Sequence, residues 1–458
     1  MSPRFTRFIF PLFSLLFLCA AFERASADTI ESALAKAYMN NPDFNAQRAA
    51  LRATDEGVQR ARAGLLPSVS ASSSLGRQSS NYNSTSTSSN DLLSPRTLGV
   101  SVTQSLYNGA RVTNQIDQSE KSVLAAREQL RSVEQKVLFG ASSGYMAVVR
   151  DTAVLKVRQA NINVLKEQLR QTEDRFNVGE VTRTDVAQVS AQLAAAEAER
   201  SSAAQASLAS SVASYQQIIG SMPDALADAV PLVNMVPTSL DQALLIGQAD
   251  HPDIRTARFS VDIAAAGVKI AQGELLPSLS LKGSLTHAND YKSADDEYND
   301  ASILASLTIP LYEGGEVHAR VRQLKETLGQ RRLEADSALR AVIAEISSAW
   351  SQYITSQARI KAAETQIEAA TVALNGTREE AKVGQRTTLD VLIADQTLLG
   401  AQVNLVTAQT DRVVASYRVL SSVGKLSANS LGLKVKGYDA KVHYDKVKGR
   451  LYGSDIEE

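Results

Sequence analysis

Two short segments of nearly the same pattern interrupt stretches that otherwise have helical composition. They are RFNVGEVTRTDV at residues 175–186 and EEAKVGQRTTLDV at residues 379–391. Each contains Val-Gly, then threonine, then Asp-Val at the same offsets, and the second Val-Gly pair lies 205 residues after the first. Glycine commonly ends a helix because it adopts positive φ without a steric penalty. The two Val-Gly pairs therefore predict the turning points of two long helical hairpins.

The residues after each turn predict where the returning helix begins. Ser, Thr, Asp and Asn are preferred N-cap residues, because their side chains accept hydrogen bonds from free N–H groups of the first turn. We expect Thr184 or Asp185 to cap the first returning helix, and Thr387 or Thr388 to cap the second. In the second returning helix, core positions recur at steps of three and four across residues 389–420, which indicates a heptad seam.

The chain contains a tandem duplication. Residues 41–70 align with residues 251–280 at a constant offset of 210, and both segments end in the Leu-Leu-Pro-Ser region. SLYNG at residues 105–109 matches PLYEG at residues 310–314 at an offset of 205. The repeat is far longer than the ~20–50 residues of a solenoid unit, so we interpret it as a duplicated half-molecule. The predicted parts are the first repeat, 28–238, the second repeat, 239–426, and a C-terminal tail, 427–458, that packs around the helices.

Each half predicts the same order of elements. A lead-in helix ends at Leu-Leu-Pro-Ser, because the residue before a proline is excluded from the helical region. The period of the apolar residues then changes to two, as at Leu98, Val100 and Val102, which predicts a strand, a polar loop and a second strand. A proline-free stretch follows that spans about 100 Å as one helix. The expected lead-in helices are 29–63 and 239–273, the polar loops 79–91 and 287–300, and the long helices 111–176 and 316–382.

The N-terminus has the features of a secretory signal peptide. Arg4 and Arg7 precede an apolar run at residues 8–22, and a small-residue sequence, Ala-Ser-Ala, follows. We predict that residues 1–27 are removed on export. Cys19, the only cysteine of the chain, lies in this segment, so the mature protein is expected to have no thiol. Beyond it, we find no segment that approaches the ~20 apolar residues of a membrane helix.

Composition narrows the functional classes. The formal net charge is −1, which gives no basis for nucleic-acid binding. Only 5% of the residues are aromatic, and the helical stretches are rich in alanine, glutamine and serine, as in long helices packed side by side. The four histidines are scattered and none lies in a His-Glu-x-x-His motif. We therefore predict no enzyme activity, no metal site and no cofactor.

The predicted strands indicate a membrane barrel. Each has about 8–11 residues, the length that crosses a bilayer as a tilted strand, although a small soluble sheet is the alternative. Four strands cannot close a barrel, since the smallest membrane barrels have about eight, and an open edge in lipid leaves backbone groups unpaired. The chain must therefore share a barrel with copies of itself, with eight strands from two copies or twelve from three. The long helices would project from one side of the membrane in a single bundle.

The duplicated set of motifs, LLPS, SLYNG and VG-x-x-T-x-x-D-V, resembles that of the TolC-like outer-membrane efflux and type I secretion channels of Gram-negative bacteria. The resemblance covers nearly the whole chain, from residue 28 to about residue 426. It implies a mainly α-helical homotrimer with a shared twelve-stranded outer-membrane β-barrel, continuous with a twelve-helix periplasmic tunnel. It also implies contact with outer-membrane lipid, and a periplasmic adaptor and an inner-membrane transporter as partners. Most of the mass would lie in the periplasm, and the protein would be a passive conduit.

The resemblance also implies roles for residues at the hairpin tips. Asp185 and Arg386 would hold the periplasmic entrance closed through contacts between hairpins, and Asp390 would contribute to an acidic ring. The family's tyrosine at the gate falls on Ala381, and a second aspartate of the ring falls on Ile393, which implies a looser gate and a thinner ring. The residues that would contact an adaptor are Val178, Gly179, Thr182, Val383, Gly384 and Thr387.

Two questions stay open at the level of sequence. The alternative to a channel is a periplasmic adaptor or coiled-coil structural protein without a pore, although an adaptor would have one helical hairpin flanked by β-rich domains. The exported substrate is not specified, because drugs, a secreted protein or polysaccharide would use the same conduit. The polar loops are expected to face the outside of the cell, as longer loops do in such barrels.

Overall fold

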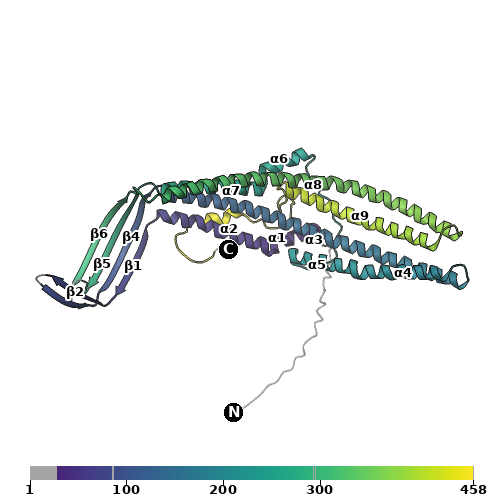
Figure 1. Ribbon diagram of the computed structural model, residues 1–458, viewed down its shortest axis with the longest axis horizontal. Helices are drawn as coiled ribbons and strands as arrows, with labels where there is room; N and C mark the ends of the chain where they lie inside the picture. Colours follow the sequence, from purple (N-terminus) through teal and green to yellow (C-terminus); the bar gives the residue numbers. More distant parts are fainter. Residues whose placement is uncertain (1–27, 85–86, 292, 294, 457–458) are drawn as a thin grey trace, which may run out of the picture.

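The structure is a computed structural model that describes residues 28–456 except 85–86, 292 and 294 (Figure 1). The predicted signal peptide, with Cys19, lies outside the described residues, so its removal stays a prediction. A β-sheet occupies one end of an elongated molecule, and two long helical hairpins reach the opposite end (Figure 1). Both hairpins leave the sheet on the same side, as the sequence predicts.

The two long helices predicted from the proline-free stretches are confirmed. They are α3 (Arg111–Asn177) and α8 (Glu316–Lys382), with 67 residues each. α8 returns as one continuous helix, α9 (Thr388–Ser422), which packs along α8 and also against α3. α9 has the length and apolar composition of a membrane span, although the sequence predicted none beyond the signal peptide. α3 returns as α4 (Arg183–Glu199) and α5 (Gln205–Ile219), joined by a π-helical turn at Arg200–Ala204.

The lead-in segment of each repeat is two helices, and the prediction of a single helix is wrong. The helices are α1 (Ile30–Asn40), α2 (Pro42–Arg62), α6 (Leu240–Asp250) and α7 (Pro252–Gly273). Asn41 and His251 separate them, and each adopts an extended conformation because a proline follows it. Both side chains then cap the next helix: Asn41 Oδ1 accepts a hydrogen bond from Phe44 N at 3.1 Å, and His251 Nδ1 accepts one from Asp253 N at 3.2 Å.

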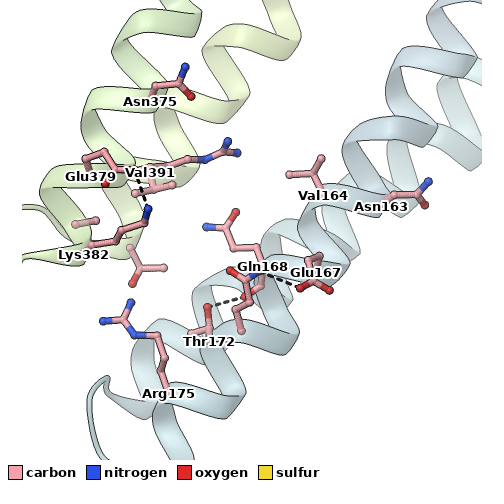
Figure 2. A pocket seen from close by; sticks show the side chains of 14 residues that line it. Asn163, Val164, Glu167, Gln168, Thr172, Arg175, Asn375, Glu379, Lys382 and Val391 are labelled. Atoms are coloured by element: carbon pink, nitrogen blue, oxygen red, sulfur yellow. Dashed lines mark hydrogen bonds and ion pairs between the residues drawn. The ribbon is translucent and has the colours of Figure 1, made fainter.

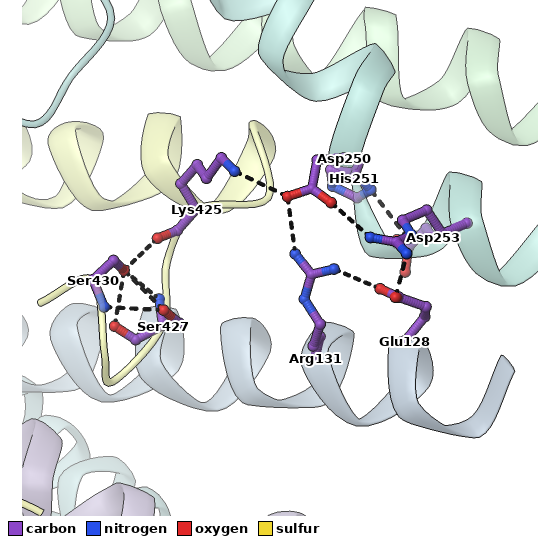
Figure 3. A network of polar contacts seen from close by, with 9 residues as sticks. Glu128, Arg131, Asp250, His251, Asp253, Lys425, Ser427 and Ser430 are labelled. Carbon is purple, nitrogen blue, oxygen red and sulfur yellow. Dashed lines mark hydrogen bonds and ion pairs between the residues drawn. The ribbon is translucent and has the colours of Figure 1, made fainter. Parts of the chain in front are cut away.

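A network of charges fixes the α6–α7 break to the rest of the bundle (Figure 3). Asp250 accepts hydrogen bonds from Lys425 Nζ, just after α9, and from Arg255 Nη1 of α7, both at 2.9 Å. Arg131 of α3 contacts Asp250 at 3.4 Å and Glu128 at 2.6 Å. Burial alone would raise the pKa of the Asp250 carboxyl, but hydrogen bonds from Lys425 and Arg255 lower this pKa to about 2. The network therefore joins three helices from both repeats at one point.

The strands of the two repeats form one antiparallel sheet. Its members are β1 (Ser68–Leu75), β4 (Arg96–Asn108), β5 (Ser278–Asn289) and β6 (Glu297–Thr308). Their order is β1-β4-β5-β6, so the repeats meet where β4 pairs with β5. The outer edges of β1 and β6 have no neighbouring strand in the described part of the chain.

The predicted polar loop of the first repeat is wrong in its structure, because most of it forms a second hairpin. β2 (Gln78–Ser84) pairs with β3 (Thr87–Leu93) as a separate two-stranded sheet. Antiparallel pairing satisfies the backbone N–H and C=O groups of this segment. The segment has no alternation of apolar residues, so the sequence pattern did not indicate these strands. In the second repeat the strands also extend further than predicted, and residues 290–296 connect them.

One face of the four-stranded sheet is apolar. Residues directly opposite each other in neighbouring antiparallel strands point to the same face. Val100 lies opposite Ala71 and Leu285, and Leu285 lies opposite Ala301. This face is uncovered in the single chain, since Leu285 is 62% exposed and Ile303 is 83% exposed. A soluble sheet would bury such a face against another layer.

The opposite face of the sheet is polar. Ser101 lies opposite Ser70 and Ser284, and Ser284 lies opposite Ser302. Hydroxyl groups join across the strands, at 2.9 Å between Ser70 Oγ and Ser101 Oγ and at 2.8 Å between Ser284 Oγ and Ser302 Oγ. The sheet therefore alternates between an apolar and a hydroxyl-rich surface along every strand.

The C-terminal tail packs against α2, as expected for a segment that lies around the helices. Its helix α10 (Ala440–Val447) contacts α2, and Tyr438 N donates a hydrogen bond to Tyr38 Oη at 3.0 Å. His443 Nδ1 lies 3.0 Å from Oδ2 of Asp55, whose side chain is fully buried. Apolar residues of the tail also join the largest core cluster, which includes Leu34, Phe44, Tyr145, Tyr215, Tyr417 and Leu426.

Two glycines allow the sheet to pass directly into the helices. Gly109 has a φ of 65° and precedes α3, while Gly273 ends α7. A Cβ atom on Gly273 would lie 2.5 Å from the Gly109 carbonyl oxygen and 2.6 Å from Arg111 Cγ. These contacts are shorter than side chains allow, so the backbones of the two repeats approach closely only because both positions are glycine.

We predict that Gly273→Ala lowers the thermal unfolding midpoint measured by circular dichroism. The added methyl group forces the β4–α3 turn away from α7, and overpacking of this kind costs about 1–3 kcal/mol. Gly57→Ala is the matched control, because Gly57 lies within α2 and a Cβ atom added there would have no neighbouring atom within 4 Å. The control midpoint is expected to stay the same or rise, and equal midpoints for the two variants would contradict the proposed close approach.

Candidate functional site at the hairpin tips

Both predicted turns are confirmed in position and conformation. Gly179 has a φ of 81° and Gly384 has a φ of 80°. In the first turn, Gly179 N donates to the Phe176 carbonyl and Glu180 N donates to the Arg175 carbonyl, both at 2.9 Å. These bonds satisfy carbonyl groups that the end of α3 would leave free. The turn of the second hairpin has the same pattern.

The caps of the returning helices are Thr182 and Thr387. Each threonine side chain accepts a hydrogen bond from the N–H of the aspartate three residues on, at 3.3 Å for Asp185 and 3.2 Å for Asp390. Each aspartate carboxylate in turn accepts the threonine N–H, at 2.9 Å in both hairpins. The two turns therefore hold equivalent capping boxes. The prediction of Thr387 is confirmed.

The prediction of Thr184 or Asp185 as the first cap is wrong. Thr182 has the extended conformation that an N-cap residue requires, whereas residues 183–199 are already helical. Asp185 is the third residue of the helix, where it completes the capping box.

The two aspartates that the resemblance singled out are thus held by their own turns, and Asp185 also receives a hydrogen bond from the Thr388 hydroxyl of the other hairpin. Hydrogen bonds from the hydroxyl and the N–H of Thr182 lower the pKa of the Asp185 carboxyl. Hydrogen bonds from the N–H and hydroxyl of Thr387 lower the pKa of the Asp390 carboxyl. Both groups therefore stay ionised at neutral pH and below, and they present fixed negative charge at the tips.

Arg386 also has a partner within its own turn. Its Nε lies 2.9 Å from Oε2 of Glu380, and this carboxylate raises the pKa of the guanidinium. The first hairpin holds a similar pair, Arg175 Nε with Glu180 Oε2 at 3.0 Å. Asp185 and Arg386 lie on different hairpins, and no contact joins them among the described residues of the single chain. A pair between them in an assembly stays a proposal.

A groove separates the two hairpins just above the tips (Figure 2). Its volume is about 770 Å³. α3 contributes Gln168, Thr172 and Arg175 on one side, and α8 contributes Glu379 and Lys382 on the other (Figure 2). The lining mixes these charged and polar side chains with apolar ones, namely Val164, Ala381 and Val391. Outside this groove, Val178 and Val383 place apolar side chains in solvent, with exposures of 72% and 71%.

Sequence reasoning missed one charged pair near the tips. Arg378 Nη2 of α8 lies 3.3 Å from Oδ1 of Asp395 of α9. Burial raises the pKa of the Asp395 carboxyl, and Arg378 lowers it less than burial raises it. The available signal was an aspartate within the apolar run of α9, two residues after Ile393. Asp395 differs from Asp185 and Asp390 because its carboxylate accepts no backbone N–H that would offset the cost of burying its charge.

Comparison with known proteins shows close relatives over almost the whole chain. The family model described as outer membrane efflux protein matches residues 33–221 and 246–425. The outer membrane efflux protein BepC of Brucella suis is 38% identical over 94% of this chain and 93% of its own length. The outer membrane protein TolC of Vibrio cholerae is 28% identical over 92% of this chain and 98% of its own length. The Campylobacter jejuni CmeC outer membrane channel has the same fold, with a TM-score of 0.78, 17% identity, and coverage of 92% and 89%.

We predict that replacing aspartate by asparagine destabilises the tips at Asp185 and Asp390 but stabilises them at Asp395. Because folding lowers the pKa of Asp185 and Asp390, their ionised forms stabilise the tips above the ordinary pKa, and this stabilisation is lost as pH falls through the lowered pKa. Burial raises the pKa of Asp395, so its ionised form disfavours the folded tip at neutral pH and this effect disappears as pH falls through the raised pKa.

At pH 7 we therefore expect Asp185→Asn and Asp390→Asn to speed amide hydrogen exchange in their turns by about twofold to tenfold, as for a weakened helix cap. Asp395→Asn is expected to slow exchange around Asp395, with a smaller difference at acidic pH. Hydrogen-exchange mass spectrometry of the tip peptides measures all three. Slowed exchange in the capping variants, or faster exchange in Asp395→Asn, would contradict the assigned environments.

Proposed function

The chain belongs to the outer membrane efflux protein family, and on that premise we propose that three copies close one β-barrel and one helical tunnel around a common pore. The protein is an outer-membrane export channel with a fold of the TolC-like type. The adaptor alternative does not fit, because two equivalent helical hairpins share one sheet in this chain. We propose that it is a passive conduit without a catalytic step of its own.

The observation that carries the proposal is a sheet with two different faces and two free edges. The apolar face suits lipid, and the hydroxyl-rich face suits a water-filled lumen. In a bilayer, the free edges of β1 and β6 would leave backbone groups unpaired at a cost of several kcal/mol each. Pairing of β6 with β1 of the next copy removes both edges. Three copies of four strands then give a closed twelve-stranded barrel.

The duplication supplies the register of this intermolecular pairing. Within the chain, β4 of the first repeat pairs with β5 of the second, and Ser101 lies opposite Ser284. β6 is the repeat equivalent of β4 at an offset of 205, and β1 is the equivalent of β5 at an offset of 210. The same pairing between copies therefore places Ser306 opposite Ser74 of the next copy.

The helices extend the same argument into the tunnel. α3 packs against α7 within the chain, so the repeat symmetry predicts that α8 packs against α2 of the next copy. Leu333 and Val372 on α8 are 71% and 69% exposed in the single chain, as expected for a face that awaits a neighbour. Continuous helical walls would then lead from the barrel to the hairpin tips.

We place the closed periplasmic entrance at those tips. Asp185 and Arg386 would pair between neighbouring hairpins, with Arg386 leaving or sharing Glu380. Such exposed pairs contribute only about 0–1 kcal/mol each, so a docked partner can reverse them. Asp390, repeated around the axis, would form a ring of fixed negative charge that favours cations. The absence of a tyrosine at Ala381 removes one further contact from this gate.

The proposed partners are a periplasmic adaptor and an inner-membrane transporter. The adaptor would contact the exposed turns around Val178 and Val383, together with Gly179, Thr182, Gly384 and Thr387. The β2–β3 hairpin and the loop at residues 290–296 would face the outside of the cell, opposite the tips (Figure 1). Small molecules and secreted proteins would both travel through this path.

The barrel proposal predicts a specific intermolecular crosslink. A Ser74→Cys, Ser306→Cys variant is expected to form covalent oligomers on mild oxidation in outer-membrane fractions, seen by non-reducing electrophoresis. Ser74→Cys with Ser302→Cys is the matched control, because four residues shift the second cysteine by about 13 Å along the strand. The control is expected to stay monomeric in the gel. Equal crosslinking of both pairs, or none in the first, would overturn the predicted register.

The gate proposal predicts a change in conductance. Asp185→Asn with Arg386→Gln is expected to raise single-channel conductance in planar bilayers several-fold, because the charges that would close the entrance are gone while asparagine keeps an acceptor for Thr182. Asp390→Asn weakens the equivalent cap and is expected to lower cation selectivity without opening the pore. Arg175→Gln with Glu180→Gln removes the other tip pair and controls for lost charge. Unchanged conductance in the gate variant would show that Asp185 and Arg386 only stabilise their own turns.

A further inference from the structure

A cleft lies between α2 and the C-terminal tail, away from the hairpin tips and from the sheet. Its volume is about 370 Å³, within the range of pockets that bind small molecules. α2 contributes Arg48 and Arg52, and the tail contributes Lys436, Tyr438 and Val442. The remaining lining residues are Gly437, Asp439, His443 and Lys446.

The cleft has an excess of positive charge. Arg48, Arg52 and Lys436 face it, and Asp439 is the one carboxylate among the described residues of its lining. That carboxylate already accepts a hydrogen bond from Lys441 N at 2.9 Å as the cap of α10. Arg52 and Lys436 have no hydrogen bond or ion pair to any residue in the described part of the chain. Two cations held in one cleft without a counter-charge repel each other, and an anion between them removes this repulsion.

The nearby carboxylates do not supply that anion. Asp55 is fully buried beneath the cleft and is paired with His443 at 3.0 Å. Glu56 and Asp455 lie on an adjoining hollow that also includes Arg52, but neither makes an ion pair with Arg52 among the described residues. The positive charge of Arg52 and Lys436 is therefore available to a ligand.

The walls of the cleft are held in place by packing. The guanidinium of Arg48 lies over the rings of Phe44, Tyr38 and Tyr438, at 4.1, 4.7 and 5.3 Å from their centres. Its Nη1 donates a hydrogen bond to Asn45 Oδ1 at 2.8 Å. The tail is fastened on both sides of the cleft, at Tyr438 by the hydroxyl of Tyr38 and at His443 by Asp55. The walls of the cleft are therefore pre-formed, and a ligand orders mainly the side chains of Arg52 and Lys436 on binding.

We propose that this cleft binds a small organic anion, with its carboxylate or phosphate group held by Arg52 and Lys436 and its apolar part against Tyr438 and Val442. The planar guanidinium of arginine donates two parallel hydrogen bonds to either oxyanion, and lysine adds a point charge. The ligand contacts α2 and the tail together, so its binding fastens the tail to the bundle. The cleft shares no lining residue with the groove at the hairpin tips.

The test uses the full chain in detergent and three probes: benzoate, phenyl phosphate and inorganic phosphate. Saturation-transfer NMR measures binding, and hydrogen exchange of residues 436–447 measures the fastening of the tail. We expect saturable binding of at least one aromatic anion, weaker binding of inorganic phosphate, and slower exchange in the tail when the aromatic anion is bound. The comparison of benzoate with phenyl phosphate identifies whether carboxylate or phosphate is preferred.

Two variants test whether the aromatic anions bind in this cleft. Arg52→Gln with Lys436→Gln is expected to weaken binding at least about tenfold, since two charge-assisted hydrogen bonds are lost. Arg60→Gln with Lys434→Gln removes the same charges from α2 and the tail but outside the cleft, and is expected to bind as the unmodified protein does. No saturable binding of either aromatic anion, unchanged binding in the first variant, or equal loss in the second would overturn the proposal. Binding of inorganic phosphate as tight as that of phenyl phosphate would exclude the apolar part of the site.

Discussion

A β-strand edge in a bilayer must be paired within the protein, and the rest of this architecture depends on that constraint. One chain pairs β1 with β4, β4 with β5 and β5 with β6, which leaves one edge of β1 and one edge of β6. Because of the tandem duplication, one mode of strand pairing is enough to cover these edges. The β4–β5 pairing that joins the two repeats of one chain can also join two copies, as β6 with β1. Alternation of Val100 and Leu285 with Ser101 and Ser284 gives the sheet one apolar face, which suits lipid, and one hydroxyl-rich face, which suits water.

The helical part combines a fixed middle with locally stabilised tips. In the middle, the Asp250 carboxylate at the end of α6 contacts Arg131 of α3, Arg255 of α7 and Lys425, which follows α9. These partly shielded charges join the three helices and the segment after α9. At the tips, the capping boxes and the pairs Arg175–Glu180 and Arg386–Glu380 are exposed and confined to their own turns. Contacts of this kind keep each hairpin folded on its own, while a buried apolar cluster of Leu165, Val189 and Leu392 joins the two hairpins of one chain. Movement of neighbouring hairpins at the proposed gate would therefore not unfold the helices that form it.

The two repeats use different chemistry to hold the same backbone. Asn40 and Asn45 occupy the positions of the first repeat that correspond to Asp250 and Arg255, so the charge network cannot form there. The first repeat instead packs Arg48 over aromatic rings and accepts the C-terminal tail through Tyr38 and Asp55. Because the tail packs on α1, α2 and α3 of the first repeat, the surfaces of the two repeats differ, and the basic cleft is one of these differences.

The repeats, the two long helices and the turns at Gly179 and Gly384 could all be predicted from local patterns, because helical periodicity without proline and the need for positive φ are local properties of the chain. The sequence also identified Asp185, Asp390 and Arg386 as tip residues, but their partners depended on geometry: the choice of Thr182 over Thr184 rests on which residue is still extended when the helix begins. The pairing of β2 with β3 gave no apolar alternation to detect. The contacts of Asp250 with Lys425, Arg378 with Asp395 and His443 with Asp55 depend on packing between separate helices, which no local pattern encodes. Asp250 and Lys425 lie at the two ends of the second repeat, 175 residues apart, and meet only when that repeat has folded.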